Sequence, residues 1–248
     1  MNNKIEAIFL DLGNTLRMLQ KDEQFQAEAR QKIVDLLGAK ENPEKFCEIL
    51  NQRYKAYRVW AFENLTEAPE ADLWTRWLAP DFQPENVAAQ AVELTYQFRR
   101  SNGRRVLVEN GREVVVELDR RGYTLGIISN LISSREIPEW IEQDGFGPYF
   151  KSVLLSSVFG KRKPDPAIYH EAARRAGVEP RSCVYVGDNL DRDVTGTRAA
   201  GFGMVIIMLP QGDPDKVSIP SENRPDIIIH KFRELLDIFP GRAPERSQ

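Results

Sequence analysis

Short apolar segments rich in Ile and Val constrain the fold of this 248-residue chain more than any other feature. Six of them span residues 5–10, 123–129, 152–155, 183–187, 204–208 and 226–229. Runs of this kind, bounded by Gly, Asp, Asn or Pro, are typical of buried strands. From Gly111 onward helical patterns separate them, which predicts a parallel sheet covered on both faces. We therefore expect an α/β fold with a Rossmann-like sheet.

The long stretch between the first two segments carries no pattern typical of a strand. Apolar residues recur there at helical spacing, and helices are expected after Asp22, Asn42, Pro69 and Pro84. This pattern predicts an all-helical domain of residues 17–105 inserted into a core formed by residues 1–16 and 106–248. The insertion should create a cleft at the carboxyl ends of the strands.

Two groups of residues in the insertion have alternative interpretations. The aromatic side chains of Trp60, Trp74 and Trp77 are expected in the core of the insertion rather than against a planar substrate. The basic stretch near Gly103 indicates a solvated hinge rather than a phosphate or nucleic-acid contact. Its members are Arg99, Arg100, Arg104 and Arg105.

Charge and cysteine content exclude several classes of protein. Lys and Arg number 34 and Asp and Glu 37, so no overall basic field exists to attract nucleic acid or an anionic membrane. Cys47 and Cys183 are too few for a disulfide framework, and the first residues lack an apolar run suited to export or membrane insertion. We expect a soluble cytoplasmic protein that binds neither nucleic acid nor membranes.

Acidic side chains follow two of the predicted strands directly. Asp11 comes after the segment of residues 5–10, and Asp188 comes after that of residues 183–187. Because parallel strands end at the same edge of a sheet, the two carboxylates should lie close together. Converging carboxylates bind a hard cation such as Mg²⁺ well. The alternative for either residue alone is ordinary turn chemistry.

Four motifs, in order along the chain, resemble those of the haloacid dehalogenase superfamily. Asp11-Leu12-Gly13-Asn14-Thr15 is similar to its first motif, DxDxT, and Ser129-Asn130 to its second. Lys163-Pro164 resembles the third motif, and the segment from Gly187 to Asp193 fits the fourth, GDxxxxD. The helical insertion lies where the largest subgroup of this superfamily carries a cap domain. The resemblance covers residues 4–209.

The resemblance implies a phosphohydrolase mechanism and a role for each matching residue. Asp11 would be the nucleophile that forms an aspartyl-phosphate, and Ser129 and Lys163 would act with it in catalysis. Mg²⁺ would be held by Asp11, Asp188 and the backbone carbonyl of Gly13. The resemblance further implies substrate contacts from Thr15 and from the Asn130 backbone N–H, and a supporting role for Asp193. Lys161 and Asp191 are the less favoured alternatives to Lys163 and Asp193.

The chain departs from the first motif at Gly13, where the superfamily carries the Asp that protonates the leaving group. A positioned acid–base group contributes about 10²–10⁴-fold in rate, so alkyl phosphates should react slowly. Asp22, Glu23 or Glu63 are possible substitutes. We expect a Mg²⁺-dependent phosphatase for a small phosphorylated metabolite. The alternatives are a 2-haloacid dehalogenase-like hydrolase and a catalytically impaired protein that binds or regulates.

Overall fold

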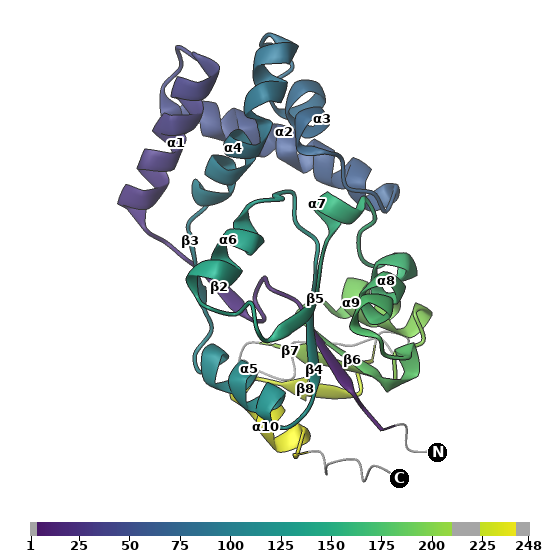
Figure 1. Cartoon of the computed structure of the whole chain (residues 1–248). Coiled ribbons are helices and arrows are strands. Elements are labelled where there is room, and N and C mark those ends of the chain that lie inside the picture. Colours follow the sequence, from purple (N-terminus) through teal and green to yellow (C-terminus); the bar gives the residue numbers. More distant parts are fainter. Residues whose placement is uncertain (1–3, 210–223, 242–248) are drawn as a thin grey trace.

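A computed structural model describes residues 4–209 and 224–241, and its centre is a parallel sheet of six strands (Figure 1). The strand order is β5-β4-β1-β6-β7-β8, so β1 lies between the strands that carry the second and fourth motifs. All six predicted strands are present, with shifts of up to two residues at their ends. Their bounds are β1 Ala7–Leu10, β4 Thr124–Ser129, β5 Phe150–Leu155, β6 Cys183–Gly187, β7 Met204–Met208 and β8 Ile227–Ile229.

Helices cover both faces of the sheet, as the alternating pattern predicts. One face packs against α5 (Gly111–Arg120), α6 (Glu136–Gln143), η5 (Phe232–Glu234) and α10 (Leu235–Ile238). The other face packs against α8 (Pro166–Ala176) and α9 (Leu190–Ala199). A short helix, α7 (Ser156–Phe159), follows β5, and the 3₁₀ turn η2 (Pro180–Ser182) precedes β6. The predicted fold class is confirmed.

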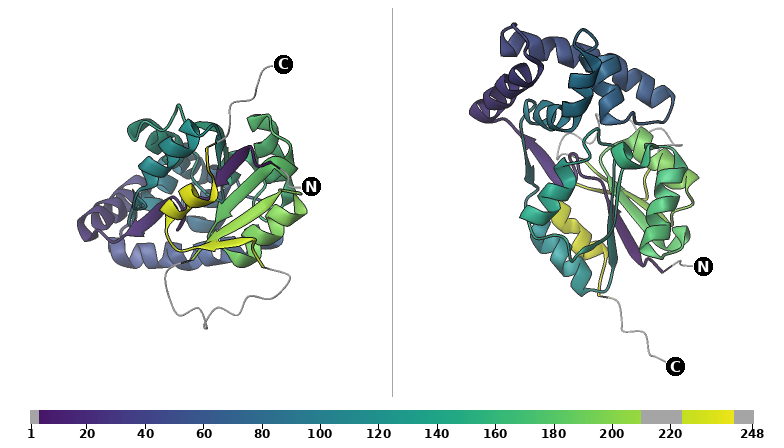
Figure 2. Two further views of the ribbon diagram at one scale, coloured as in Figure 1. Left: turned by 90° about the horizontal axis from the view of Figure 1, so that it is seen from below. Right: turned by 45° about the horizontal axis from the view of Figure 1, so that its top comes forward.

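A helical unit lies beyond one end of the sheet and has a hydrophobic core of its own (Figures 1 and 2). It contains α1 (Glu23–Leu37), α2 (Pro43–Glu63), α3 (Glu70–Asp72), the π-helix η1 (Leu73–Leu78) and α4 (Pro84–Arg100). Asp22 caps α1 by accepting a hydrogen bond from the Phe25 N–H, 3.1 Å away. Trp74 is fully buried, and Trp60 and Trp77 pack against the same cluster, so these aromatic residues belong to the core of the unit.

Two strands that the sequence analysis did not predict connect the helical unit to the sheet. β2 (Arg17–Gln20) pairs antiparallel with β3 (Arg104–Leu107) and forms a separate ribbon. Each strand has two polar and two apolar residues and is incompletely buried, so neither forms the apolar run by which a strand is recognised. The ribbon lies at the limits proposed for the insertion, residues 17 and 105, which stay a prediction.

The carboxyl ends of the central strands face the helical unit. Residues that follow β1, β4 and β6 line the same cavity as residues of α4 and of the ribbon. Within residues 4–209 and 224–241, no helix combines the length and the apolar character needed to cross a membrane.

Candidate active site

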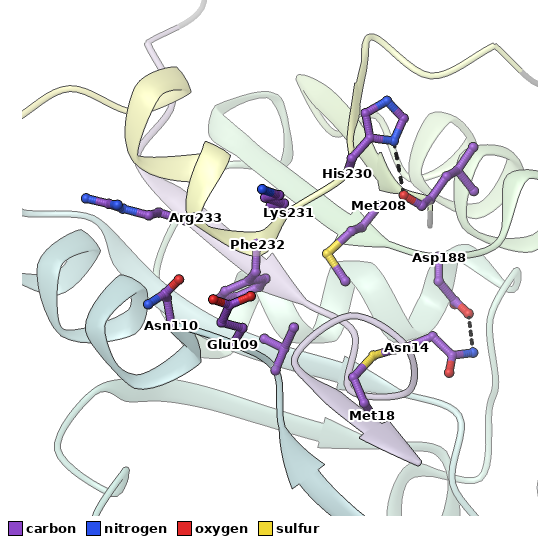
Figure 3. Close-up of a pocket in the computed structure, with 12 residues that line it drawn as sticks. Asn14, Met18, Glu109, Asn110, Asp188, Met208, His230, Lys231, Phe232 and Arg233 are labelled. Carbon is purple, nitrogen blue, oxygen red and sulfur yellow. Dashed lines mark hydrogen bonds between the residues drawn. The ribbon is translucent and has the colours of Figure 1, made fainter. Parts of the chain in front are cut away.

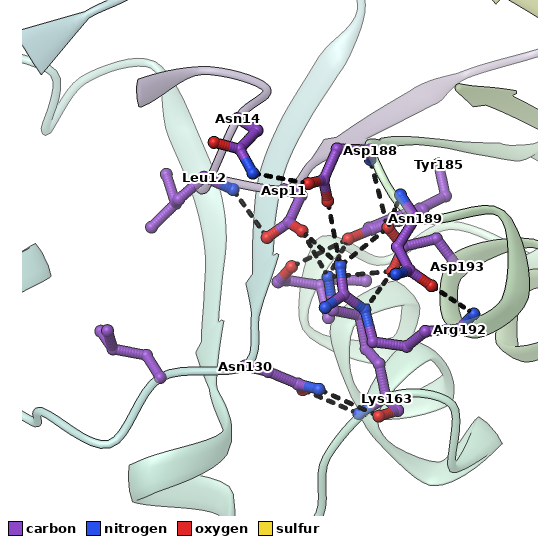
Figure 4. A network of polar contacts seen from close by, with 12 residues as sticks. Asp11, Leu12, Asn14, Asn130, Lys163, Tyr185, Asp188, Asn189, Arg192 and Asp193 are labelled. Atoms are coloured by element: carbon purple, nitrogen blue, oxygen red, sulfur yellow. Dashed lines mark hydrogen bonds and ion pairs between the residues drawn. The ribbon is translucent and has the colours of Figure 1, made fainter. Parts of the chain in front are cut away.

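Three carboxylates converge at the carboxyl ends of β1 and β6 (Figure 4). Asp11 directly follows β1, and its backbone N–H donates to the Val186 carbonyl at 2.8 Å, which fixes the end of β1 against β6. Asp188 directly follows β6, and Asp193 lies in the first turn of α9. One oxygen of each carboxylate lies within 4.8 Å of the others. The predicted convergence of Asp11 and Asp188 is confirmed.

Asp193 is fully buried and organises the loop that carries Asp188. Its Oδ2 accepts hydrogen bonds from the backbone N–H groups of Asp188 at 3.2 Å and of Asn189 at 3.1 Å. This approach requires glycine at position 187, because a Cβ there would lie 2.4 Å from the same oxygen. Asp191 is exposed, so the structure favours Asp193 over Asp191 as the supporting acid.

Lys163 joins two of these carboxylates from below the protein surface. Its side chain is fully buried, with Nζ 3.0 Å from Asp11 Oδ2 and 3.3 Å from Asp193 Oδ1. Although burial alone would raise the pKa of Asp193, the positive charges of Lys163 and Arg192 hold that pKa below its ordinary value. Lys161 instead lies on the surface, 3.7 Å from Asp165, so Lys163 is the lysine at the carboxylate cluster.

Two side-chain contacts that sequence reasoning did not predict, from Asn130 and Tyr185, hold Lys163 in place. The Asn130 side chain donates to the Lys163 carbonyl at 2.9 Å and accepts from the Lys163 N–H at 2.8 Å. The Lys163 ammonium donates to the hydroxyl of Tyr185, a buried side chain of β6. Tyr185 lies on an apolar strand, where its sequence pattern indicates only core packing.

Arg192, also missed by sequence reasoning, brings a guanidinium group into the carboxylate cluster (Figure 4). Its Nη2 lies 3.0 Å from Asp11 Oδ2 and 3.1 Å from Asp188 Oδ1. The same nitrogen lies 3.0 Å from Asp193 Oδ2, and Nε lies 2.8 Å from Asp193 Oδ1. A single positive group therefore contacts all three carboxylates. The sequence offered no signal for this, because an arginine in the first turn of a helix is usually solvated.

The surroundings of Asp188 disfavour its charged form, unlike those of Asp193. Burial raises the pKa of Asp188, the nearby Asp11 carboxylate raises it further, and a hydrogen bond from Asn14 and the charge of Arg192 act against this. The Asn14 Nδ2 donates to Asp188 Oδ2 at 2.9 Å. Asn14 has a φ of 55°, a left-handed conformation that asparagine tolerates better than most residues. A cation at the cluster would lower the cost of ionising Asp188.

A cavity of about 300 Å³ opens beside Asp11 and contains several of the predicted residues. Gly13, Ser129, Asn130 and Asp188 all line it. Thr15, by contrast, is fully buried, and its hydroxyl has no hydrogen-bond partner among the described residues. Thr15 does not line this cavity, and its contact with substrate stays a prediction.

The part of the chain that the structure describes places no replacement for the missing acid at Gly13 in this cavity. Among the described residues, Asp11 and Asp188 are the only carboxylates found in its lining. Asp22 instead caps α1 and accepts from Arg104 at 3.1 Å, while Glu23 and Glu63 lie at the first turn of α1 and the last of α2. A Cβ at Gly13 would have no atom within 4 Å, so the position has room for a side chain.

A second cavity, of about 640 Å³, is lined in part by Asp188 (Figure 3). Its lining includes Met208 at the end of β7, and His230 and Phe232, which follow β8. Asn14 and Asp188 line both cavities, so this hydrogen-bonded pair stands between them.

The solvated-hinge interpretation is wrong for two of the four arginines near Gly103. The side chains of Arg99 and Arg105 are only 21% and 20% exposed, and both line the cavity beside Asp11. Arg104 is half-exposed, as expected for a hinge. For Arg105 the physical reason is the unpredicted ribbon, since alternation along β3 directs Arg104 and Arg105 to opposite sides. Arg99 lies in α4 instead and is held by its ion pair with Glu136 at 2.7 Å.

Comparison with known proteins identifies relatives of this chain. The chain is 36% identical over 125 residues to a glyceraldehyde 3-phosphate phosphatase of Methanopyrus kandleri. The matched stretch covers 50% of this chain and 52% of that protein. The chain thus spans about half the length of this relative. A phosphoserine phosphatase of Thermus thermophilus is 28% identical over 232 residues, which cover 82% of this chain and 89% of that protein.

The fold has a solved counterpart, and a family model matches most of the chain. The crystal structure of a 2-haloacid dehalogenase from Pseudomonas syringae aligns with a TM-score of 0.66 at 23% identity, covering 94% of this chain and 97% of that one. This likeness concerns the fold alone. Because residues 5–201 match the model of the haloacid dehalogenase-like hydrolases, the chain belongs to this family of hydrolases.

Proposed function

We propose that this protein is a phosphatase for a small phosphorylated metabolite and that it forms an aspartyl-phosphate on Asp11. The observation that carries the proposal is the arrangement around Asp11: an ammonium at 3.0 Å, two further carboxylates and the Ser129 side chain at one cavity. The relatives described above are named as phosphatases of glyceraldehyde 3-phosphate and phosphoserine, which are small phosphorylated compounds.

The residues of the site divide the reaction into two displacements. An Asp11 oxygen attacks phosphorus, and the bond from phosphorus to the leaving oxygen breaks with its electron pair on that oxygen. Lys163 and Ser129 stabilise the charge that develops on the phosphoryl oxygens. A water molecule then attacks phosphorus and loses a proton to solvent, and the bond from phosphorus to the Asp11 oxygen breaks, which releases inorganic phosphate and the Asp11 carboxylate.

The three carboxylates fit a hard divalent cation such as Mg²⁺. The carboxylates offer oxygen ligands at the ends of β1 and β6. The positively charged Arg192 guanidinium already lies among them, where a metal cation would bind. Bound Mg²⁺ would reduce repulsion between the nucleophile and the phosphoryl group. Asp11, Asp188 and the Gly13 carbonyl would hold it. Arg192 must give up its contacts with Asp11 and Asp188 for this to happen, so Arg192 competes with the metal.

The lack of an acid at Gly13 limits which phosphates react quickly. A leaving oxygen of low basicity departs without being protonated, whereas a strongly basic alkoxide leaves slowly unless an acid protonates it. Acyl phosphates, phosphoanhydrides and aryl phosphates therefore suit this site better than alkyl phosphates. The cavity lining supports this selection, since its described carboxylates are those already assigned to the nucleophile and the metal.

A 2-haloacid dehalogenase activity is the second candidate, and the position of Arg192 favours it. Attack of Asp11 on carbon with loss of halide needs neither an acid at position 13 nor a metal. An arginine within 3.1 Å of Asp11 and Asp188 supplies positive charge beside the nucleophile without Mg²⁺. The retained cluster of three carboxylates favours the phosphatase instead.

A single activity screen distinguishes these candidates. The purified protein is assayed with Mg²⁺ and with EDTA against phosphorylated metabolites, acetyl phosphate, an aryl phosphate and 2-chloropropionate. The proposal predicts Mg²⁺-dependent phosphate release, fastest for acyl and aryl phosphates, and its loss in Asp11→Asn. Chloride release that persists in EDTA, without phosphate release, would instead establish the dehalogenase.

A further inference from the structure

Three arginines gather beside the cavity at the junction between the helical unit and the sheet. Arg99 lies in the last turn of α4, Arg105 lies in β3 and Arg17 lies in β2. All three line the cavity that contains Asp11. None of them is used by the chemistry proposed above. Their presence beside the nucleophile therefore requires a separate explanation.

One carboxylate is shared by these arginines. Glu136, in the first turn of α6, has its Oε2 2.7 Å from Arg99 Nε and its Oε1 3.6 Å from Arg105 Nη1. Burial would raise the pKa of Glu136, but the charges of Arg99 and Arg105 outweigh it and hold that pKa below the ordinary value. Asp144 is a second carboxylate, whose charge acts on Arg17, so two carboxylates face three guanidinium groups and leave them with an excess of positive charge.

The excess positive charge is partly withdrawn from water. Burial, and next the neighbouring Arg99, lower the pKa of Arg105 to about 10. Arg17 stacks on the Trp140 ring at 4.3 Å and donates to the Arg105 carbonyl, while its buried Nε has no partner among the described residues. Guanidinium groups that lie close together, are partly buried and have N–H donors without an acceptor form a binding site for an anion.

We infer that Arg99 and Arg105, supported by Arg17, bind a carboxylate of the substrate, so that the substrate is a small phosphorylated carboxylic acid. The inference rests on the proposed function, since Asp11 must receive the phosphoryl group at the other part of the cavity. The volume of about 300 Å³ suits a metabolite of few carbon atoms. A planar guanidinium fork matches a carboxylate, and Arg99 already donates from Nε to the Glu136 carboxylate at 2.7 Å.

The test compares two phosphonates that differ in one charge. Phosphonoacetate and its neutral amide, phosphonoacetamide, are titrated into the full-length protein with Mg²⁺ by calorimetry. Phosphonoacetate should bind about tenfold to a hundredfold more tightly, as expected for charge-assisted hydrogen bonds to a carboxylate. Arg99→Gln and Arg105→Gln should each remove most of this preference and leave phosphonoacetamide binding unchanged. Arg104→Gln, a half-exposed neighbour, should retain it.

The outcomes separate this inference from the proposed function. Equal binding of both phosphonates to the wild-type protein would overturn the carboxylate site while the phosphatase proposal stands. In that case Arg99 and Glu136 form only a contact between α4 and α6. Binding of neither phosphonate would overturn the proposed function and this inference together. The wild-type comparison needs no variant, so it decides the question even if Arg105→Gln fails to fold.

Discussion

Replacement of Arg192 tests the competition between this arginine and a divalent cation. Arg192→Gln removes the positive charge that contacts Asp11, Asp188 and Asp193. In the wild-type protein a metal must displace the Nη2 contacts with Asp11 and Asp188, at 3.0 and 3.1 Å. In the variant no such contacts have to be broken. We therefore expect Arg192→Gln to bind Mn²⁺ and Mg²⁺ more tightly than the wild-type protein.

The expected magnitude follows from those two contacts. A hydrogen bond to a charged group contributes about 1.5–3 kcal/mol. The displaced guanidinium keeps its contact with Asp193 and gains hydrogen bonds to water, because its side chain is 24% exposed. The net free energy lost with the two bonds should therefore equal that of about one such bond. The loss of about 1.5–3 kcal/mol of competition corresponds to about a tenfold to hundredfold lower dissociation constant.

Mn²⁺ titration followed by electron paramagnetic resonance measures this affinity without any substrate. Arg198→Gln is the matched control, because Arg198 lies on the same helix and pairs with Asp226 at 2.7 Å, away from the cluster. Without metal, Arg192→Gln should also unfold at a lower temperature than the control. Equal Mn²⁺ affinities in a folded Arg192→Gln and the wild-type protein would refute the competition.

Three further substitutions test other parts of the account. Gly13→Asp should speed alkyl phosphate turnover by about 10²–10⁴-fold, whereas Gly13→Asn should not, and equal rates in all three proteins would show that Gly13 does not limit the reaction. Glu136→Gln should cost about 1–3 kcal/mol in denaturant unfolding at neutral pH. Because the folded pKa of Glu136 is lowered, this difference should persist above pH 4.5 and narrow as the pH falls below it; a constant difference would contradict the assignment. Gly187→Ala should destabilise by about 1–3 kcal/mol through the clash with Asp193, and Gly147→Ala, which meets no atom within 4 Å, should be neutral; similar losses in both would argue against the packing explanation.

The sheet could be predicted because its strands are apolar on both faces. Residues 7–10 and 183–187 are fully buried and form short apolar runs, which are typical of central parallel strands. β2 and β3 lack such a run, since they form a two-stranded ribbon outside the core. Their pairing depends on contacts between residues 17–20 and 104–107, far apart in the chain.

The acidic part of the site could be predicted because strand order fixes it. Asp11 and Asp188 directly follow adjacent parallel strands, so their proximity needs no knowledge of side-chain packing. Lys163 could be predicted from its motif, but the positions of Arg192, Tyr185 and Arg105 could not. Arg192 reaches the cluster by its rotamer, Tyr185 by the face of β6 on which it lies, and Arg105 by the register of an unpredicted ribbon. Charged side chains with these sequence neighbours are usually solvated, and only the assembled fold brings them together.

The central claim is that Asp11 is a nucleophile toward phosphorus. Incubation of the protein with Mg²⁺ and excess acetyl phosphate, followed by rapid acid quenching and peptide mass spectrometry, tests this claim most directly. The account predicts a phosphoryl group on the peptide that contains Asp11, labile to hydroxylamine and absent from Asp11→Asn. An unmodified Asp11 at saturating acetyl phosphate, in a folded protein shown to bind Mg²⁺, would contradict it.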